Sequence, residues 1–92
     1  MIKNSLGKIP VWVLALGYRN AQKIAEEDLG LRPSQWCYLS AVHQLRATTN
    51  PLYVLDASFW ARHDAHQLYA ELDHREARPI TKTELALLRE LR

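Results

Sequence analysis

Residues Val11–Leu31, VWVLALGYRNAQKIAEEDLGL, read as a buried strand, a corner and a helix that ends on a glycine. Val11–Leu16 is a continuous apolar run, which is typical of a strand buried on both faces of a parallel sheet. Asn20 is a favourable N-cap for a helix that begins at Ala21. Gly30 follows the last apolar position of that helix and suits the left-handed residue that ends it. The stretch therefore predicts a strand–helix unit against which the other segments pack.

Shorter patterns indicate the remaining elements. Strands are expected at the runs QWCYL and LYVL, and helices where apolar residues recur three and four positions apart. Strands that alternate with helices indicate a parallel sheet with right-handed crossovers. The sequence therefore predicts a Rossmann-like α/β domain, in which helices flank a small three-stranded parallel sheet and a C-terminal helix follows. The expected segments are a strand at Gln35–Leu39, a short helical turn at Ala41–Arg46, a strand at Leu52–Leu55, a helix over 64–76 capped by Asp64 and Gln67, a break at Arg78-Pro79, and a helix over Lys82–Leu91 capped by Thr81 and Glu84, with the path of Ala57–His63 left open.

Length and composition indicate a single domain over residues 1–92, with an arm at 1–9, an α/β core at 10–76 and the C-terminal helix at 80–92. The formal charge of +2 is too small to predict nucleic-acid binding by itself. No apolar run approaches the roughly 20 residues of a membrane span. The N-terminus is faintly similar to a secretory signal, but cleavage there would remove the best strand, so we expect a cytoplasmic protein. The single cysteine, Cys37, excludes an intrachain disulfide and is interpreted as a buried strand residue.

Polar side chains follow each expected strand at the point where it ends. Because ligands of open α/β sheets bind beyond the carboxyl ends of the strands, these side chains are the candidate ligand-binding residues. The start of the first helix, together with an arginine guanidinium, could hold a phosphate. We therefore expect a ligand or nucleotide, if any binds, at this edge of the sheet. The candidates are Tyr18, Arg19 and Asn20 after the first strand, Ser40 and His43 after the second, and Asp56 after the third.

The turn after the first strand lacks the glycines of a nucleotide loop. Residues 17–21, GYRNA, contain one glycine where a dinucleotide fingerprint has three, and no Gly-Lys-Ser/Thr follows. Arg19 can instead be a structural partner of Asp56 or of a helix end. Asp56 is similar to the acid that ends a strand in nucleotide hydrolases, but capping of the following turn explains it better. No cofactor is therefore predicted.

Catalysis and metal binding have no supporting motif. His63 and His66 could meet at one point, but a metal site needs three or four converging ligands. Ser40, His43 and Asp56 can be drawn as a Ser–His–Asp trio, yet no G-x-S-x-G elbow surrounds Ser40. The sequence therefore predicts no metal site and no catalytic residue.

Two apolar features are candidates for a partner interface. The last helix carries a leucine stripe, and an aromatic pair lies in the segment whose path is open. Core packing is the default explanation of such a stripe. A terminal helix after a proline break can also dock on another chain, and each leucine removed from water contributes about 1.5–3 kcal/mol. The candidate interface residues are Phe59, Trp60, Leu85, Leu88 and Leu91.

Four short segments can be compared with known groups, namely LALGYRNA at 14–21, WCYL at 36–39, LRA at 45–47 and YVLD at 53–56. They resemble a group of small uncharacterised proteins from phages of actinobacteria. That group has a Tyr-Arg-x-Ala helix start, a Trp-x-Tyr strand, a Leu-Arg-Gly turn and a valine-rich third strand. This chain has Ala47 where the glycine is usual, so its turn can differ. The resemblance implies a phage origin, a location in the host cell and a small Rossmann-like domain without a P-loop, and it implies no activity.

A second resemblance concerns architecture alone. The order of strand, helix with an alanine-rich face, strand, short helix and strand is similar to part of the second RecA-like domain of helicases. The helicase arginine motifs are not recognisable, so this likeness carries no function. The leading hypothesis is a non-enzymatic binding or adaptor protein that acts through protein contacts, with a host protein or a second copy as its partner. The alternative is a nucleotide- or nucleic-acid-binding accessory protein that uses the ends of the strands.

Overall fold

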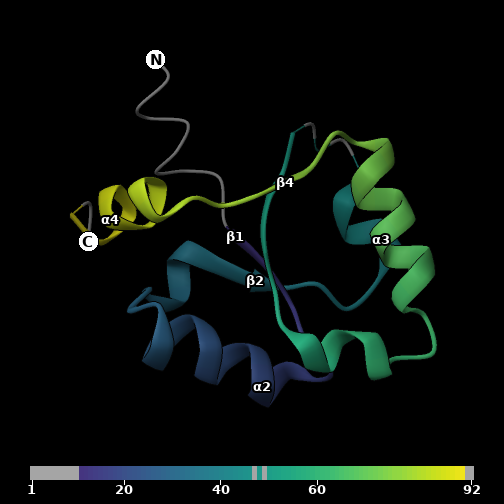
Figure 1. The fold of residues 1–92 in the computed structure, drawn as a ribbon, viewed down its shortest axis with the longest axis horizontal. Coiled ribbons are helices and arrows are strands. Elements are labelled where there is room, and N and C mark those ends of the chain that lie inside the picture. Colours follow the sequence, from purple (N-terminus) through teal and green to yellow (C-terminus); the bar gives the residue numbers. More distant parts are fainter. Residues whose placement is uncertain (1–10, 47, 49, 91–92) are drawn as a thin grey trace.

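The computed structural model describes residues 11–46, 48 and 50–90, and its centre is a parallel sheet. The described strands lie in the order β2-β1-β3-β4, so β1 has a neighbour on each side (Figure 1). β1 is buried along its whole length, as its continuous apolar run predicts. The expected parallel α/β fold is confirmed, while the expected arm at 1–9 lies outside the described residues. The strands are β1 Val11–Leu14, β2 Trp36–Tyr38, β3 Leu52–Leu55 and β4 Arg78–Pro79.

The expected number of three strands is wrong, because β4 adds a fourth. The Arg78 N–H donates to the Pro51 carbonyl at 3.0 Å, and the Ile80 N–H donates to the Tyr53 carbonyl at 2.9 Å. Since alternate residues of a parallel strand bond to one neighbour, Pro79 turns its missing N–H away from β3. Proline is compatible with an edge strand for this reason. A pair of residues is too short to show a strand pattern in the sequence.

The first helix begins earlier than the sequence predicts. α2 spans Tyr18–Gln22 and continues as the wider-wound η1 over Lys23–Asp28. Its N-cap is Gly17, whose carbonyl accepts from the Ala21 N–H at 3.1 Å. The predicted capping by Asn20 is therefore wrong, because Asn20 already lies inside the first turn.

The end of this helix is formed as predicted. Gly30 has a φ of 69°, which confirms the left-handed residue expected there. The Leu31 N–H donates back to the Ala25 carbonyl at 2.9 Å. Arg89, from the last helix, donates from Nε to the Leu29 carbonyl at 2.7 Å and so satisfies another group at the helix end.

The connections between strands contain short helical turns, and η4 gives the path of the segment that the sequence left open. Within the described residues, no helix has both the length and the apolar character that a membrane span needs. The remaining elements are η2 Pro33–Gln35, η3 Val42–Leu45, η4 Ala57–Ala61, α3 Ala65–His74 and α4 Lys82–Glu90.

The two expected capping boxes have different outcomes. Thr81 Oγ1 accepts from the Glu84 N–H at 3.2 Å, and Glu84 Oε1 accepts from the Thr81 N–H at 3.0 Å, which confirms the box at the start of α4. The box predicted at the start of α3 is wrong. The Asp64 side chain makes no cap hydrogen bond there and instead pairs with Arg62.

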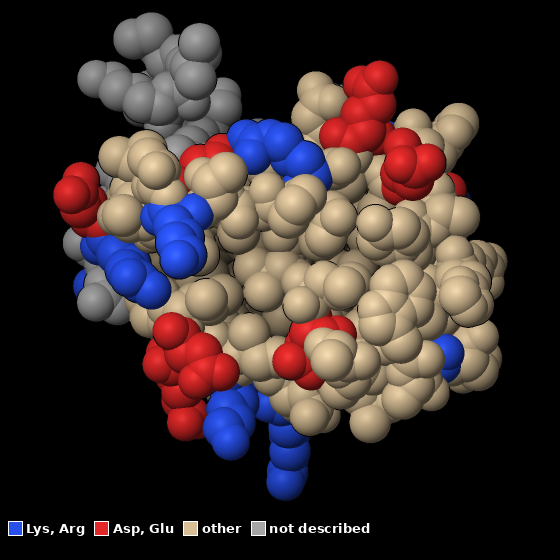
Figure 2. All heavy atoms as spheres, in the orientation of Figure 1, with Lys and Arg blue, Asp and Glu red and all other residues tan. Residues whose placement is uncertain are grey.

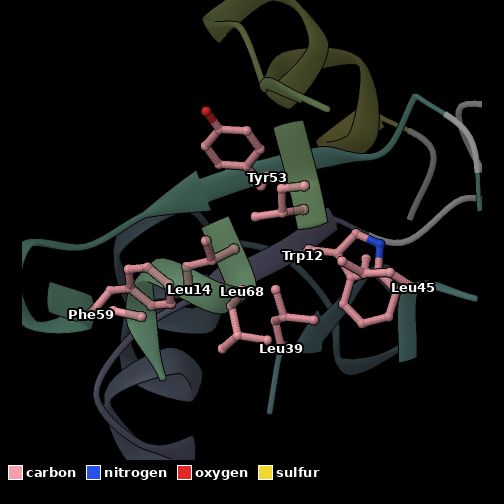
Figure 3. Close-up of a cluster of buried hydrophobic side chains, with 9 residues drawn as sticks. Trp12, Leu14, Leu39, Leu45, Tyr53, Phe59 and Leu68 are labelled. Atoms are coloured by element: carbon pink, nitrogen blue, oxygen red, sulfur yellow. The ribbon is translucent and has the colours of Figure 1, made fainter. Parts of the chain in front are cut away.

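Helices cover both faces of the sheet and bury two hydrophobic clusters. Figure 1 shows α2 and α4 on one side of the sheet and α3 on the other. The cluster under α2 and α4 includes Val11, Val13, Trp36 and Leu88. The cluster under α3, η3 and η4 is drawn in Figure 3 and consists of Trp12, Leu14, Leu39, Leu45, Tyr53, Phe59, Ala65, Leu68 and Leu72. β1 supplies residues to both clusters because successive side chains of a strand point to opposite faces.

Candidate functional site

Arg62, which the sequence analysis did not select, lies at the ends of β1 and β2. Its side chain is only 10% exposed, and Nη1 donates to the Leu39 carbonyl at 2.9 Å and to the Tyr38 hydroxyl at 3.0 Å. Nη2 donates to the Ser40 carbonyl at 3.0 Å. Nε and Nη2 also pair with the two carboxylate oxygens of Asp64, at 2.8 and 2.9 Å. All five N–H groups of the guanidinium are therefore used by acceptors of the chain itself.

The Arg62–Asp64 pair leaves the guanidinium no free donor for an anion at the ends of β1 and β2. The hydrogen bond from Arg62 lowers the pKa of Asp64, so this carboxylate keeps its charge and neutralises the guanidinium. An arginine whose donors are all used has none left for a phosphate. The carboxyl ends of β1 and β2 are thus joined by a side chain of the chain itself.

Asp56 closes the end of β3 in a similar way. As the N-cap of η4, it accepts from the Ser58 N–H at 3.0 Å and also from the Ser58 hydroxyl. Ser58 Oγ in turn accepts from the Leu16 N–H at 3.2 Å. Capping therefore accounts for Asp56, as the alternative interpretation of the sequence held, and it ties the end of β3 to the end of β1.

The other candidate ligand-binding residues do not meet at one point. Arg19 and Asn20 are exposed on α2, and Arg19 takes part in none of the three ion pairs among the described residues. His43 is exposed on η3. Across residues 11–46, 48 and 50–90, no group of three His, Cys, Asp or Glu side chains is arranged to hold a metal ion. Of the six candidates, Tyr18 and Ser40 share a surface, which is a groove beside β2.

This groove, called the β2 groove below, runs along an edge strand of the sheet. Its volume is about 370 Å³, which is within the range of small-ligand and peptide pockets, and it is open to solvent. Cys37, interpreted from the sequence as buried, is partly exposed and lies in its wall, and burial raises the pKa of its thiol. Among the described residues no charged side chain lines the groove, and its walls are Tyr18, Pro33, Trp36, Cys37, Tyr38, Ser40 and Gln44.

Three aromatic side chains form one wall of the β2 groove. The ring centroids of Tyr18 and Trp36 are 5.7 Å apart, and those of Tyr18 and Tyr38 are 6.0 Å apart. Trp36 is buried, and its Nε1–H donates to Glu26 at 3.1 Å. The Arg62 guanidinium lies over the Tyr38 ring, 5.5 Å from its centroid. Neighbours on both sides therefore hold this wall in place, while Tyr18 remains 55% exposed.

The backbone of β2 presents hydrogen-bonding groups to the same groove. The Leu39 N–H donates to the Val13 carbonyl at 3.1 Å, so the backbone groups of Cys37 and Leu39 point toward β1. Alternate residues of a parallel strand bond to opposite sides, so the groups of Trp36 and Tyr38 point away from β1. The edge of β2 is therefore the outer boundary of the sheet and the inner boundary of the groove.

Gln44 occupies part of that edge with its side-chain amide. Its Nε2 donates to the Tyr38 carbonyl at 3.3 Å, while its Oε1 accepts from the Ser40 N–H at 2.6 Å and from the Ala41 N–H at 2.9 Å. Among the described residues, no hydrogen bond is made by the Trp36 carbonyl or the Tyr38 N–H. The edge of β2 is thus satisfied at its carboxyl end and open in its middle.

The candidate interface residues are mostly inside the core. Phe59 is fully buried and Leu88 is 1% exposed, so a partner cannot reach either side chain while the fold is intact. Leu85 is half-buried and packs against the same cluster as Leu88. Leu91 lies outside the described residues. Core packing, the default explanation, accounts for the described part of the leucine stripe, and Trp60 is the one member of the aromatic pair that reaches the surface, at 43% exposed.

Trp60 belongs to a second group of exposed rings, called the aromatic surface below. Its centroid lies 5.6 Å from that of His66 and 5.4 Å from that of Tyr69. Burial and a hydrogen bond with Tyr69 raise the pKa of the neighbouring Tyr53 to about 12. Figure 2 shows that the middle of the face that carries β3, β4 and α3 has few charged side chains. This surface lies on the β3 side of the sheet, away from β2. A substitution in it therefore serves as a control for substitutions in the β2 groove.

The residues that sequence reasoning missed come from separate elements. The sequence did offer an ion-pair partner for Arg62, because Asp64 follows two positions later, but we assigned that carboxylate to a helix cap. The groove combines α2, η2, β2 and η3, so no continuous motif contains it. Gln44 was placed in the predicted helical turn without a role. Its bonds to the Ser40 and Ala41 N–H groups cap η3 locally, whereas its bond to the Tyr38 carbonyl follows from the position of η3 beside the edge of β2.

A scan against protein-family models finds no matching family, and searches of curated proteins and of solved structures find no similar chain. The function is therefore argued from the geometry of this site.

Proposed function

We propose that this chain is a non-enzymatic binding protein that holds a segment of a partner protein in the β2 groove. The observation that carries this proposal is the groove itself, which is open, uncharged, lined by aromatic rings and placed beside an edge strand. Tyrosine and tryptophan are enriched at protein interfaces, and peptide recognition commonly uses aromatic grooves and sheet edges. Tyr18 is the principal contact in this proposal, because it is the most exposed ring of the wall.

The proposal keeps the setting that the phage resemblance implies. The partner is a host protein, the location is the cytoplasm of the host cell, and the α/β fold is Rossmann-like. The motifs that carry the resemblance contain Tyr18, Trp36 and Tyr38, which are the three rings of the groove wall. Self-association is not carried forward, because the described part of the leucine stripe that favoured it packs in the chain's own core.

The second candidate is nucleotide or nucleic-acid binding, and the aromatic wall is the observation that favours it. Bases stack on tyrosine and tryptophan rings with little dependence on sequence. Phosphates, however, need nearby cations, and no lysine or arginine of the part of the chain that the structure describes lines the groove. The donors of Arg62, at the ends of the strands, are already used. A peptide segment fits this uncharged lining better.

A selection from a displayed library of random peptides tests the proposal. The native chain is the bait, and the library is first depleted on the bare support. Peptides that survive are titrated against native protein, Tyr18→Ala and Trp60→Ala by calorimetry. We expect Tyr18→Ala to weaken binding at least roughly tenfold, as for other aromatic contacts at interface centres, and Trp60→Ala to leave it unchanged.

Two results overturn the proposal. The first is that the selected peptides bind Tyr18→Ala as well as native protein, or lose affinity only with Trp60→Ala. The second is that no peptide survives while an oligothymidylate binds and is released by salt, which is the behaviour of a nucleic-acid-binding protein.

A further inference from the structure

We infer that the partner segment joins the sheet as an extended, uncharged strand beside β2 and takes the place that the Gln44 side chain now holds. This inference rests on the proposed function, because it describes how the β2 groove takes up a segment. The occupant is a strand-forming stretch of a partner protein, and three features of the edge support it.

The first feature is an open pair of backbone groups. The Trp36 carbonyl and the Tyr38 N–H point away from β1 and flank Cys37, which lies in the groove wall. In a parallel pair, one residue donates to the carbonyl before, and accepts from the N–H after, the residue that it faces. A residue of an added strand opposite Cys37 would therefore make two backbone hydrogen bonds that the described residues leave unmade.

The second feature is the next hydrogen-bonding position along the edge, where a residue of the added strand would lie opposite Leu39. There Gln44 donates to the Tyr38 carbonyl and accepts from the Ser40 N–H, which is the pair of bonds that a strand residue would make. A side-chain amide carries the same donor and acceptor as a peptide group. Gln44 thus protects the edge when the groove is empty, in the way that other proteins use charge or proline. A strand residue would make the bonds to Tyr38 and Ser40 again, so the exchange loses only the bonds that Gln44 accepts from the Ala41 N–H and the Ser40 hydroxyl.

The third feature is the chemistry of the two sides of the edge. Successive side chains of an added strand would point alternately to the aromatic wall and to the side where Cys37 packs against the other core cluster. The described lining of the groove contains no charged residue on either side. A lysine or glutamate in the added strand would lose water without gaining a partner there. The structure therefore favours a segment of uncharged, β-forming residues.

Backbone methylation of a probe peptide tests the strand geometry. The probe is a short capped peptide of alternating valine and threonine, and a proline–alanine peptide of equal length is the comparison. A strand bonds to one neighbour through every second residue, so N-methylation should abolish binding at alternate positions and spare those between. The readout is calorimetric titration against the native chain.

Variants of Gln44 test whether its amide is displaced. Gln44→Ala removes the competing amide, so the valine–threonine probe should bind roughly tenfold more tightly. Gln44→Glu is the matched control. It keeps an acceptor for the Ser40 and Ala41 N–H groups but cannot donate to the Tyr38 carbonyl, so we expect it to bind the probe no more tightly than native protein. Far-UV circular dichroism and thermal melts establish that both variants are folded.

The outcomes separate this inference from the proposed function. If the proline–alanine peptide binds in the groove, or if N-methylation has no alternating effect, the strand geometry is wrong while the proposed function stands. If Gln44→Ala weakens binding or leaves it unchanged, the displacement of Gln44 is wrong. The proposed function fails separately, when selected peptides do not depend on Tyr18.

Discussion

Arg62 determines what the ends of the strands can bind. Ligands of open α/β sheets use the carboxyl ends of the strands, where the chain turns and polar groups gather. In this chain the guanidinium of Arg62 reaches the carbonyls of Leu39 and Ser40, and Asp64 neutralises it. The guanidinium therefore links the ends of these strands and has no donor left for a nucleotide phosphate.

Replacement of Arg62 tests this role directly. Arg62→Met keeps much of the apolar stem but leaves Asp64 without its counter-charge and two strand-end carbonyls without a donor. We expect a loss of about 2–4 kcal/mol in the free energy of unfolding, measured by urea denaturation. Asp64→Asn is the milder control, because the guanidinium keeps its carbonyl acceptors. A change below about 0.5 kcal/mol for Arg62→Met, the range of ordinary surface substitutions, would contradict the structural role.

The pair formed by Glu84 and Arg78 gives a prediction on pH. The hydrogen bond from Arg78, with those from Thr81, lowers the pKa of Glu84 from 4.5 to about 2. Because the pKa in the folded state is below the ordinary value, the stabilisation is present above pH 4.5 and is lost as pH falls toward 2. Half of the Arg78 side chain faces water, so we expect solvent to screen much of this effect.

Thermal unfolding of Glu84→Gln between pH 2 and pH 7 measures this contribution. The native melting temperature should fall more steeply below pH 4.5 than that of the variant, so the two curves should converge at low pH. Parallel curves over the whole range would show that the carboxylate gains nothing from its neighbours.

Among the elements, the last helix shows why a sequence stripe does not identify an interface. Leu85 and Leu88 could have faced a partner, but α4 lies on the same side of the sheet as α2, and Leu88 packs with Val11 and Val13. Two hydrogen bonds fix this position, because Gln35 donates to the Leu88 carbonyl and Arg89 donates to the Leu29 carbonyl, each at 2.7 Å. The helix is therefore part of the domain core.

Alanine substitutions on α4 test whether the helix packs in the domain core or is free to dock on a partner. Leu88→Ala should cost about 2–4 kcal/mol in the free energy of unfolding, because it opens a cavity in a buried cluster. Leu87→Ala, at an exposed position of the same helix, should change it by less than about 0.5 kcal/mol. Similar costs for both substitutions would mean that α4 does not pack as described.

The elements also show which parts of a fold can be predicted from sequence. Long apolar runs and complete local motifs predicted their elements correctly. β3 has the predicted bounds, and β1 is central in the sheet. Gly30 ends the first helix and the Thr81–Glu84 box begins the last one, as expected. β4 was not predicted, because it is held by pairing with β3 and has too few residues to show a strand pattern. The predicted Asp64 cap is wrong because the guanidinium of Arg62, two residues earlier, pairs with the same carboxylate.

For the whole molecule, the position of the candidate site depended on contacts that no local pattern contains. The sequence directed attention to the ends of the strands, and Tyr18 and Ser40 do border the β2 groove. The groove also needs Pro33, Trp36 and Gln44, which meet only when β2 takes the outer position in the sheet. The order of the strands decides the position of β2, and local patterns in a single sequence do not reveal that order.

The strand order also explains how the two edges of the sheet differ. At β4, Pro79 offers no N–H to solvent, which is a common way to stop further strands from pairing. At β2, the protection comes from the Gln44 side chain, which can rotate away. In the described residues, the β4 edge therefore lacks a donor at Pro79, whereas the β2 edge is one that a partner can open, and the aromatic wall lies at β2.

Amide hydrogen exchange of the full chain, with and without the valine–threonine probe peptide, tests the central account most directly. The account predicts that the probe slows exchange at Tyr38 and leaves exchange over α3 and the aromatic surface unchanged. It also predicts slower alkylation of Cys37, the single thiol in the groove wall. Unchanged exchange at Tyr38, with slower exchange around Trp60 and Tyr69, would contradict the account and place the binding surface on the other side of the sheet.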